Sequence, residues 1–156
     1  MTPAFEVSIS QFYGRKVAVL SFFDEESKLP QALETFIAWR KANYASPDEF
    51  RTFNIIYPSD KAANKLRIDV CCEYPDGLVI EPPMTAKVLE SMQCACITGL
   101  LSEQEINDGV NFILDSWLDT VGLAPFGKKL IFERHINSYS SRHYVDAYVP
   151  IQFKTP

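Results

Sequence analysis

A few acidic and aromatic side chains are the main candidates for chemistry in this 156-residue sequence. Glu133 lies between Phe132 and Arg134 in a strand-like stretch, and Asp146 and Tyr148 lie in a second such stretch. A carboxylate paired with another carboxylate, or with a phenol, can act as a general acid and base. The plainer alternative is that Glu133 is an exposed strand residue or the partner of Arg134, because charged residues mostly lie at the surface.

Nucleophilic catalysis and metal binding find little support in the sequence. It contains no G-x-S-x-G motif, and neither His135 nor His143 has an identifiable serine or cysteine partner. The four cysteines, at positions 71, 72, 94 and 96, have no C-x-x-C spacing, so we expect reduced thiols that pack as small apolar groups. We therefore predict no metal and no cofactor, and we assign no catalytic residue.

Composition and charge indicate an ordinary globular chain with an acidic balance. The hydrophobic fraction is 47% and the net charge is −5, and a chain of this length can bury a core without disulfides or metals. An acidic chain is poorly suited to the phosphate backbone, so we expect no direct nucleic-acid binding. No apolar stretch approaches ~20 residues, and the N-terminal MTPAFEVSIS lacks a secretory signal, so we expect no membrane span and a cytoplasmic location.

The elements that must position these side chains belong to an internal repeat of the sequence. The two copies align with one constant offset, in which Val17 is paired with Cys94. The aligned pairs include VAVLSF (17–22) with CACITG (94–99), FNIIY (53–57) with LIFER (130–134), and Asp69 with Asp146. One offset aligns strand-like and helix-like segments alike. We therefore predict a single domain over residues 1–156 that consists of two copies of one unit, at about 5–75 and 78–153.

Each copy is predicted to be a β-α-β-β unit preceded by a further β-rich stretch. The predicted strands are 6–10, 17–22, 51–57 and 67–74 in the first copy, and 78–84, 94–98, 129–135 and 144–151 in the second. The first helix, near 28–43, carries Leu29, Leu33, Phe36 and Ile37 on its apolar face. The second begins with a capping box at 102–105 and stops at Gly122. The predicted fold class is α+β, with two antiparallel sheets, one helix each, around a central pocket.

Alternation along the predicted strands, including 67–74 and 144–151, separates an apolar side, which we expect to pack on the helices, from the opposite side. Leu130 and Phe132, which align with Phe53 and Ile55, are expected to face the helix. That assignment leaves Glu133 on the side away from the helix. Two sheets with polar and aromatic faces of this kind would enclose a groove suited to a ligand.

Four stretches of the chain resemble the GyrI-like domains. That family includes the effector-binding domains of AraC-type and multidrug-sensing MerR-type transcription regulators, and free-standing gyrase-inhibitory proteins. The matching stretches are KLRIDVCCEYP (65–75), SWLDTVGL (116–123), IFERHIN (131–137) and VDAYVPIQ (145–152). The resemblance implies a pocket for amphipathic, often cationic compounds, with Glu133 and Tyr148 as ligand contacts. We add four weaker candidates for the pocket wall, namely Tyr57, Phe22, Trp39 and His135.

The resemblance leads to three interpretations of function. The first, which we favour, is a stand-alone module that senses or sequesters an amphipathic, cationic small molecule, with a separate DNA-binding regulator as a protein partner. The second is a protein-interaction module similar to the gyrase-inhibitory members, in which the acidic surface meets a basic partner or gyrase. The third is a hydrolase of strained electrophiles that works through Glu133. Nothing in the sequence selects an enzymatic role.

Overall fold

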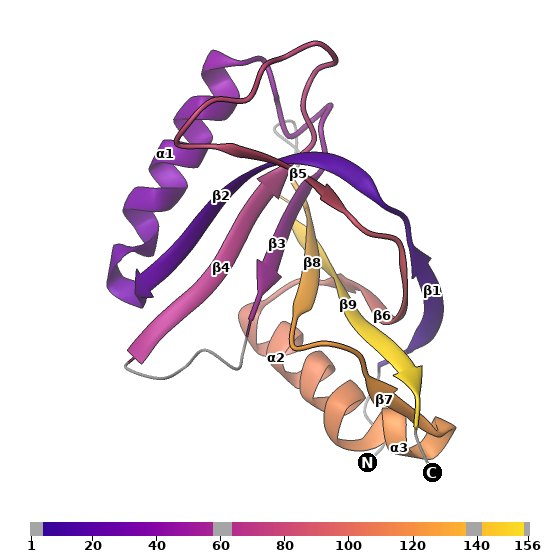
Figure 1. The fold of residues 1–156 in the computed structure, drawn as a ribbon. Coiled ribbons are helices and arrows are strands. Elements are labelled where there is room, and N and C mark those ends of the chain that lie inside the picture. The colour runs from indigo at the N-terminus through magenta and orange to yellow at the C-terminus, as the bar shows by residue number, and fades with distance from the viewer. Residues whose placement is uncertain (1–4, 58–63, 137–141, 155–156) are drawn as a thin grey trace.

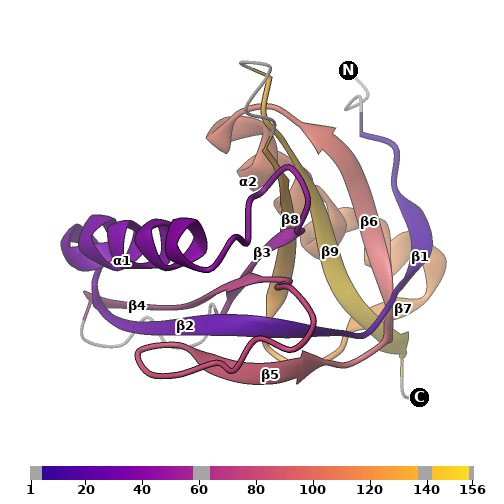
Figure 2. The same cartoon turned by 90° about the horizontal axis from the view of Figure 1, so that it is seen from above.

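The computed structural model describes residues 5–57, 64–136 and 142–154, and it is an α+β fold with a strongly curled antiparallel sheet (Figures 1 and 2). The strands are β1 (Ser8–Phe12), β2 (Arg15–Glu25), β3 (Thr52–Ile56), β4 (Lys65–Cys72), β5 (Thr85–Leu89), β6 (Met92–Leu100), β7 (Leu123–Pro125), β8 (Leu130–His135) and β9 (Tyr144–Phe153). The helices are α1 (Leu29–Ala42), α2 (Glu103–Phe112) and α3 (Leu118–Val121), and a π-helical turn (Ile113–Trp117) joins the last two. No helix in the described ranges is long and apolar enough to cross a membrane.

In place of the two separate sheets that we predicted, the strands form one continuous path. Its order is β1-β6-β9-β8-β3-β4-β2-β5, and β7 pairs with β9 off this path. The central strands of the two halves, β3 and β8, pair with each other, with Phe53 opposite Glu133. Both strands are largely buried, and buried backbone groups require hydrogen-bond partners on both edges of a strand. The pairing of β3 with β8 provides those partners and joins the halves.

Each half also contributes its first strand to the other half. The strand β1 pairs with β6, and β5 pairs with β2. The strand β1 begins at Ser8 and β5 at Thr85, and β2 begins at Arg15 and β6 at Met92, so both pairs of starting positions differ by the same number of residues. The pocket described below therefore forms in a sheet to which both halves contribute interleaved strands.

Helices cover one face of the sheet, and the other face carries an apolar cluster without helical residues. Ile68 and Val70 of β4 pack with Phe36 of α1, and Val145 and Val149 of β9 pack with the second helical run. The alternation along β4 and β9 predicted these faces correctly. The helix-free face carries a third cluster, made of Phe12, Val17, Val19, Phe53, Ile55, Cys71, Cys94 and Ile131.

The faces of β3 were predicted wrongly, although those of β8 were predicted correctly. Phe53 and Ile55 lie on the helix-free face, whereas Leu130 of β8 packs on the helix side. Direct partners in an antiparallel ladder point to the same side, and Ile55 is the partner of Ile131. The predicted alignment of Phe53 with Leu130 therefore does not match the faces on which these two residues lie. Phe53 and Ile55 alternate with the polar Thr52 and Asn54, so β3 has one apolar side, but that side packs in the helix-free cluster and not against a helix.

The boundaries of the other elements follow local chemistry. The segment 78–84 was predicted as a strand, but it is not one, and the strand begins only at Thr85. Pro82 and Pro83 lack the N–H groups that a ladder needs. The second helical run begins as predicted, because Ser102 Oγ accepts a hydrogen bond from the Glu105 backbone N–H at 3.1 Å. The run ends at Gly122, whose φ of 75° suits a residue without a Cβ.

Candidate functional site

A pocket of about 690 Å³ opens between the loop that follows α1 and the ends of β6 and β8. The loop contributes Asp48 and Arg51, β8 contributes Glu133, Arg134 and His135, and β9 contributes Tyr144. This volume lies within the range of sites for drug-sized ligands. The lining combines charged groups of both signs with an aromatic ring, so the pocket is equipped to bind a polar or amphipathic molecule.

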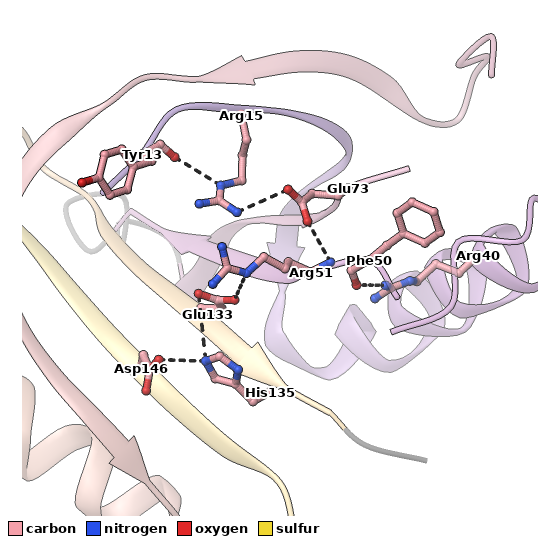
Figure 3. A network of polar contacts seen from close by, with 9 residues as sticks. All are labelled: Tyr13, Arg15, Arg40, Phe50, Arg51, Glu73, Glu133, His135 and Asp146. Carbon is pink, nitrogen blue, oxygen red and sulfur yellow. Dashed lines mark hydrogen bonds and ion pairs between the residues drawn. The ribbon is translucent and has the colours of Figure 1, made fainter. Parts of the chain in front are cut away.

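Glu133 is a buried carboxylate in the wall of this pocket. Only 4% of the residue is exposed, and its Oε2 lies 2.8 Å from Nε of Arg51 (Figure 3). A buried carboxylate needs such a partner, because removing a charge from water is costly. We considered Arg134 as the partner of Glu133, but the guanidinium that pairs with it belongs to Arg51.

The backbone next to Arg51 is held by a second pair of charged side chains. Glu73 Oε1 accepts a hydrogen bond from the Arg51 backbone N–H at 3.1 Å, and Glu73 Oε2 lies 3.3 Å from a terminal nitrogen of Arg15. Figure 3 shows the chain of contacts from Arg15 through Glu73 to Arg51 and Glu133. Glu73 therefore anchors the backbone of Arg51, while the side chain of Arg51 reaches Glu133.

Arg40 fixes the same loop from the helix side. This residue of α1 is 5% exposed, and its guanidinium donates to the carbonyl of Ala45 at 2.7 Å and to that of Phe50 at 2.8 Å. It also donates to the hydroxyl of Thr52. Burial lowers the pKa of Arg40. With three acceptors, this one side chain ties α1 to the loop that carries the pocket residues.

Two further ionisable side chains complete the polar cluster around Glu133. His135 Nε2 lies 2.8 Å from Oδ2 of Asp146 and 4.0 Å from Oε1 of Glu133. The imidazole stacks on the ring of Tyr144, with ring centroids 4.3 Å apart and planes 11° apart. The ligand atoms of Glu133, His135 and Asp146 all lie within 4.8 Å of one another, so these residues could hold a metal ion.

Tyr148 and Tyr57 lie at the edge of the helix-free cluster and are not among the residues that line the pocket. The ring of Tyr148 packs edge-on against Phe12, at 5.4 Å between centroids. Burial raises the pKa of Tyr148, and burial together with Asp69 raises the pKa of Tyr57 to about 12. The Tyr57 hydroxyl donates a hydrogen bond to Asp69 at 3.1 Å, so this aspartate holds the tyrosine in place.

Phe22 and Trp39 lie away from the pocket. Both pack in the cluster under α1, on the helix-covered side of the sheet, whereas Glu133 belongs to the opposite side. Of the six predicted ligand contacts, the structure brings Glu133 and His135 together in the pocket wall. Apolar side chains such as Phe22 and Trp39 carry no sequence mark that separates a pocket role from a core role.

No pattern in the sequence indicated Arg51 as a member of the site, and Asp146 was predicted only as a possible partner in proton transfer. Asp146 could have been joined to the site, because it is the direct partner of Glu133 in the β8–β9 pairing and the pairing of two consecutive strands is readily guessed. Arg51 immediately precedes β3, so its place follows only once β3 is known to pair with β8.

A family model described as the GyrI-like small molecule binding domain matches residues 6–152. No match was found among curated proteins.

Several solved structures share the fold. The EcmrR C-terminal domain is 10% identical, with a TM-score of 0.76 over 97% of this chain and 100% of that chain. SAV2435 bound to tetraphenylphosphonium is 8% identical, with a TM-score of 0.59 over 94% of each chain. A hydrolase from Listeria innocua is 12% identical, with a TM-score of 0.63 over 97% of this chain and 94% of that one. At these identities the likeness concerns the fold alone.

Proposed function

The chain belongs to the GyrI-like small-molecule-binding domain family, and from this premise we propose that it binds an amphipathic small molecule in the pocket beside Glu133. The observation that carries the proposal is a buried carboxylate in the wall of a cavity of about 690 Å³. A charge so poorly solvated interacts strongly with any opposite charge brought next to it. The site thus supplies a fixed anchor point and enough room for a ligand body.

The ligand we propose is a cation that takes the place of the Arg51 guanidinium on Glu133. The side chain of Arg51 is 52% exposed, whereas that of Glu133 is 5% exposed. Arg51 can therefore turn toward water at small cost while the carboxylate stays in place. The exposed ring of Tyr144 in the pocket wall offers the cation an aromatic face, which contributes about 0.5–2 kcal/mol in such contacts.

We also propose that the two halves are copies of one unit and that the pocket forms where the two halves meet. The support is the offset from β1 to β5, which equals the offset from β2 to β6. The pocket takes Arg51 from one half and Glu133 from the other. A ligand that displaces Arg51 would change a contact between the halves, and a sensing module could pass this change to a partner regulator.

The experiment that tests the function compares Glu133→Gln with the parent protein. Binding of tetraphenylphosphonium and of the uncharged triphenylphosphine oxide is followed by tryptophan and tyrosine fluorescence. Tetraphenylphosphonium has no hydrogen-bond donor, so its attraction to Glu133 is electrostatic, and loss of about 1.4 kcal/mol or more of this attraction should lower the affinity for the cation by at least roughly tenfold. The affinity for the neutral compound should change much less.

A matched control removes a carboxylate that lies outside the pocket. Glu34→Gln on the exposed side of α1 makes the same chemical change and should leave both affinities unaltered. Equal losses for the cation and the neutral compound in Glu133→Gln would contradict the proposed role. So would an equal loss of cation binding in Glu34→Gln, because binding would then follow net charge alone.

A further inference from the structure

The β8–β9 hairpin brings together three side chains of types that ligate metals. Glu133 and His135 alternate along β8 and therefore lie on one side of the strand. Asp146 lies on β9 directly opposite Glu133. Figure 3 shows the imidazole of His135 between the two carboxylates, joined to both by dashed contacts. The hairpin register alone assembles one nitrogen and two oxygen donors at a single point.

The two carboxylates each direct one oxygen at His135 Nε2 and have the other oxygen held elsewhere. Glu133 Oε2 pairs with Arg51 at 2.8 Å, while its Oε1 lies 4.0 Å from the imidazole nitrogen. Asp146 Oδ1 accepts from the Gly99 backbone N–H at 3.0 Å, while its Oδ2 lies 2.8 Å from the same nitrogen. In metal sites of proteins, hydrogen bonds and ion pairs to the second oxygen of a carboxylate orient that carboxylate toward the metal.

The surroundings of the three ligand atoms fit an ion that keeps one position open. Glu133 and Asp146 are 4% and 9% exposed, and Glu133 and His135 line the pocket of about 690 Å³. Stacking on Tyr144 fixes the plane of the imidazole. The one open coordination position of the ion would therefore face a cavity that can hold water or a small molecule.

We propose that Glu133 Oε1, His135 Nε2 and Asp146 Oδ2 form a binding site for a divalent transition-metal ion, with Zn²⁺ as the best fit. Tetrahedral Zn²⁺ with ligand distances of about 2.0–2.2 Å places its ligand atoms about 3.4 Å apart. The separations of 2.8 and 4.0 Å lie on either side of that value, and the third pair of ligand atoms lies within 4.8 Å, so the three side chains need only small movements to enclose the ion. The two carboxylates supply negative charge to the ion, part of which Arg51 offsets on Glu133, and the imidazole favours a transition metal over Mg²⁺ or Ca²⁺.

The site does not depend on the small-molecule function proposed above. The metal ion needs Asp146, which is not among the residues that line the pocket, whereas the organic cation binds beside Glu133. Loss of metal binding in an Asp146→Asn variant that still binds tetraphenylphosphonium would separate the two activities. The Arg51 guanidinium stays on the outer oxygen of Glu133 in the metal-bound form and competes only with the organic cation.

The test is calorimetric titration of the EDTA-treated full chain with ZnCl₂ and, separately, with MgCl₂. We expect one Zn²⁺ per chain and a clear preference for Zn²⁺ over Mg²⁺. His135→Gln and Asp146→Asn should each weaken Zn²⁺ binding by at least about tenfold. The matched control is His143→Gln, which removes the other histidine of the chain, an exposed residue outside the cluster, and should bind Zn²⁺ like the parent.

A second measurement keeps the test decisive if a variant fails to fold. The parent protein has two histidines, so the imidazole signals in a ¹H–¹⁵N spectrum are few, and Zn²⁺ should shift those of His135 but not those of His143. Absence of Zn²⁺ binding in the parent protein would overturn the proposal. So would equal affinity in His135→Gln, or a thiolate charge-transfer band with Co²⁺, which would assign the ion to the cysteines.

Discussion

At the scale of single residues, the members of the Arg51–Glu133 ion pair differ greatly in burial. The Arg51 side chain is 52% exposed and that of Glu133 is 5% exposed. A half-exposed guanidinium that loses its partner recovers its hydration, whereas a buried carboxylate that loses its partner does not. The pair is therefore asymmetric, and the two single substitutions should have unequal effects.

We expect Arg51→Gln to lower the free energy of unfolding by about 1.5–3 kcal/mol, because it leaves the Glu133 carboxylate buried without its cation. Glu133→Gln should cost less, since Arg51 can then turn to solvent. Arg51→Gln should also raise the affinity for a cationic ligand, because the internal competitor is gone. Urea unfolding of both variants and titration with tetraphenylphosphonium measure these quantities.

The control for Arg51→Gln is Arg51→Lys, which keeps a positive charge near Glu133 and should restore most of the stability. Equal losses of stability in Arg51→Gln and Glu133→Gln would contradict the asymmetry argued here. A cation affinity that falls in Arg51→Gln would show that the arginine helps to hold the ligand and does not compete with it.

At the scale of elements, the two helical segments differ in how deeply their apolar faces are buried. Ile113, in the π-helical turn after α2, is fully buried in the cluster under the second helical run. Ile37, in α1, is 51% exposed, although its spacing predicted it for the apolar face. On α1 the deeply buried apolar position is Phe36, while Leu33 and Trp39 are partly buried.

This difference predicts opposite results for one substitution made in both segments. Ile113→Ala should lower the free energy of unfolding by about 2–5 kcal/mol, because it empties a fully buried site. Ile37→Ala should change it by less than about 0.5 kcal/mol, since the side chain is half exposed. Chemical denaturation measures both values, and similar losses in the two variants would show that the faces of α1 are misassigned.

The positions of most elements could be predicted from the sequence because each has a local signal. The Ser102 cap, the Gly122 stop and the alternation of β4 and β9 are all legible in a short window and are confirmed. The pairing of β3 with β8 has no local signal, because it depends on how the halves meet. The sequence therefore allowed Glu133 to be predicted as a site residue, but it did not allow its ion-pair partner Arg51 to be predicted.

At the scale of the whole molecule, the sheet buries cysteine thiols, which are protonated and neutral under ordinary solution conditions. All four cysteines are free and buried. Burial raises the pKa of Cys72 and of Cys96 to about 11 and that of Cys94 to about 12, from an ordinary 9.0. In the unfolded chain these thiols lose their protons first, so ionisation above pH 9 favours the unfolded state.

We therefore expect the stability of the protein to fall as the pH rises from about 9 to about 11. The loss per buried thiol approaches about 1.4 kcal/mol for each pH unit within this window, and below pH 9 the thiols should have little effect. Urea unfolding at pH 8, 9 and 10 measures the slope. The variant Cys94→Ala lacks one of these thiols and should show a shallower slope. An unchanged slope would contradict the attribution of the pH dependence to the buried thiols.

The exchange of first strands between the halves has a consequence for synthesis on the ribosome. The strand β1 pairs with β6, which ends at Leu100, and β2 needs β5, which ends at Leu89. A nascent chain that has exposed only its first half therefore has β1 and one edge of β2 without their native partners. Unpaired edges of this kind are vulnerable to aggregation, and pairings so distant in sequence close slowly. The native sheet of this protein can be completed only after most of the chain has left the ribosome, so its yield in the cell should depend on chaperones that protect the growing first half.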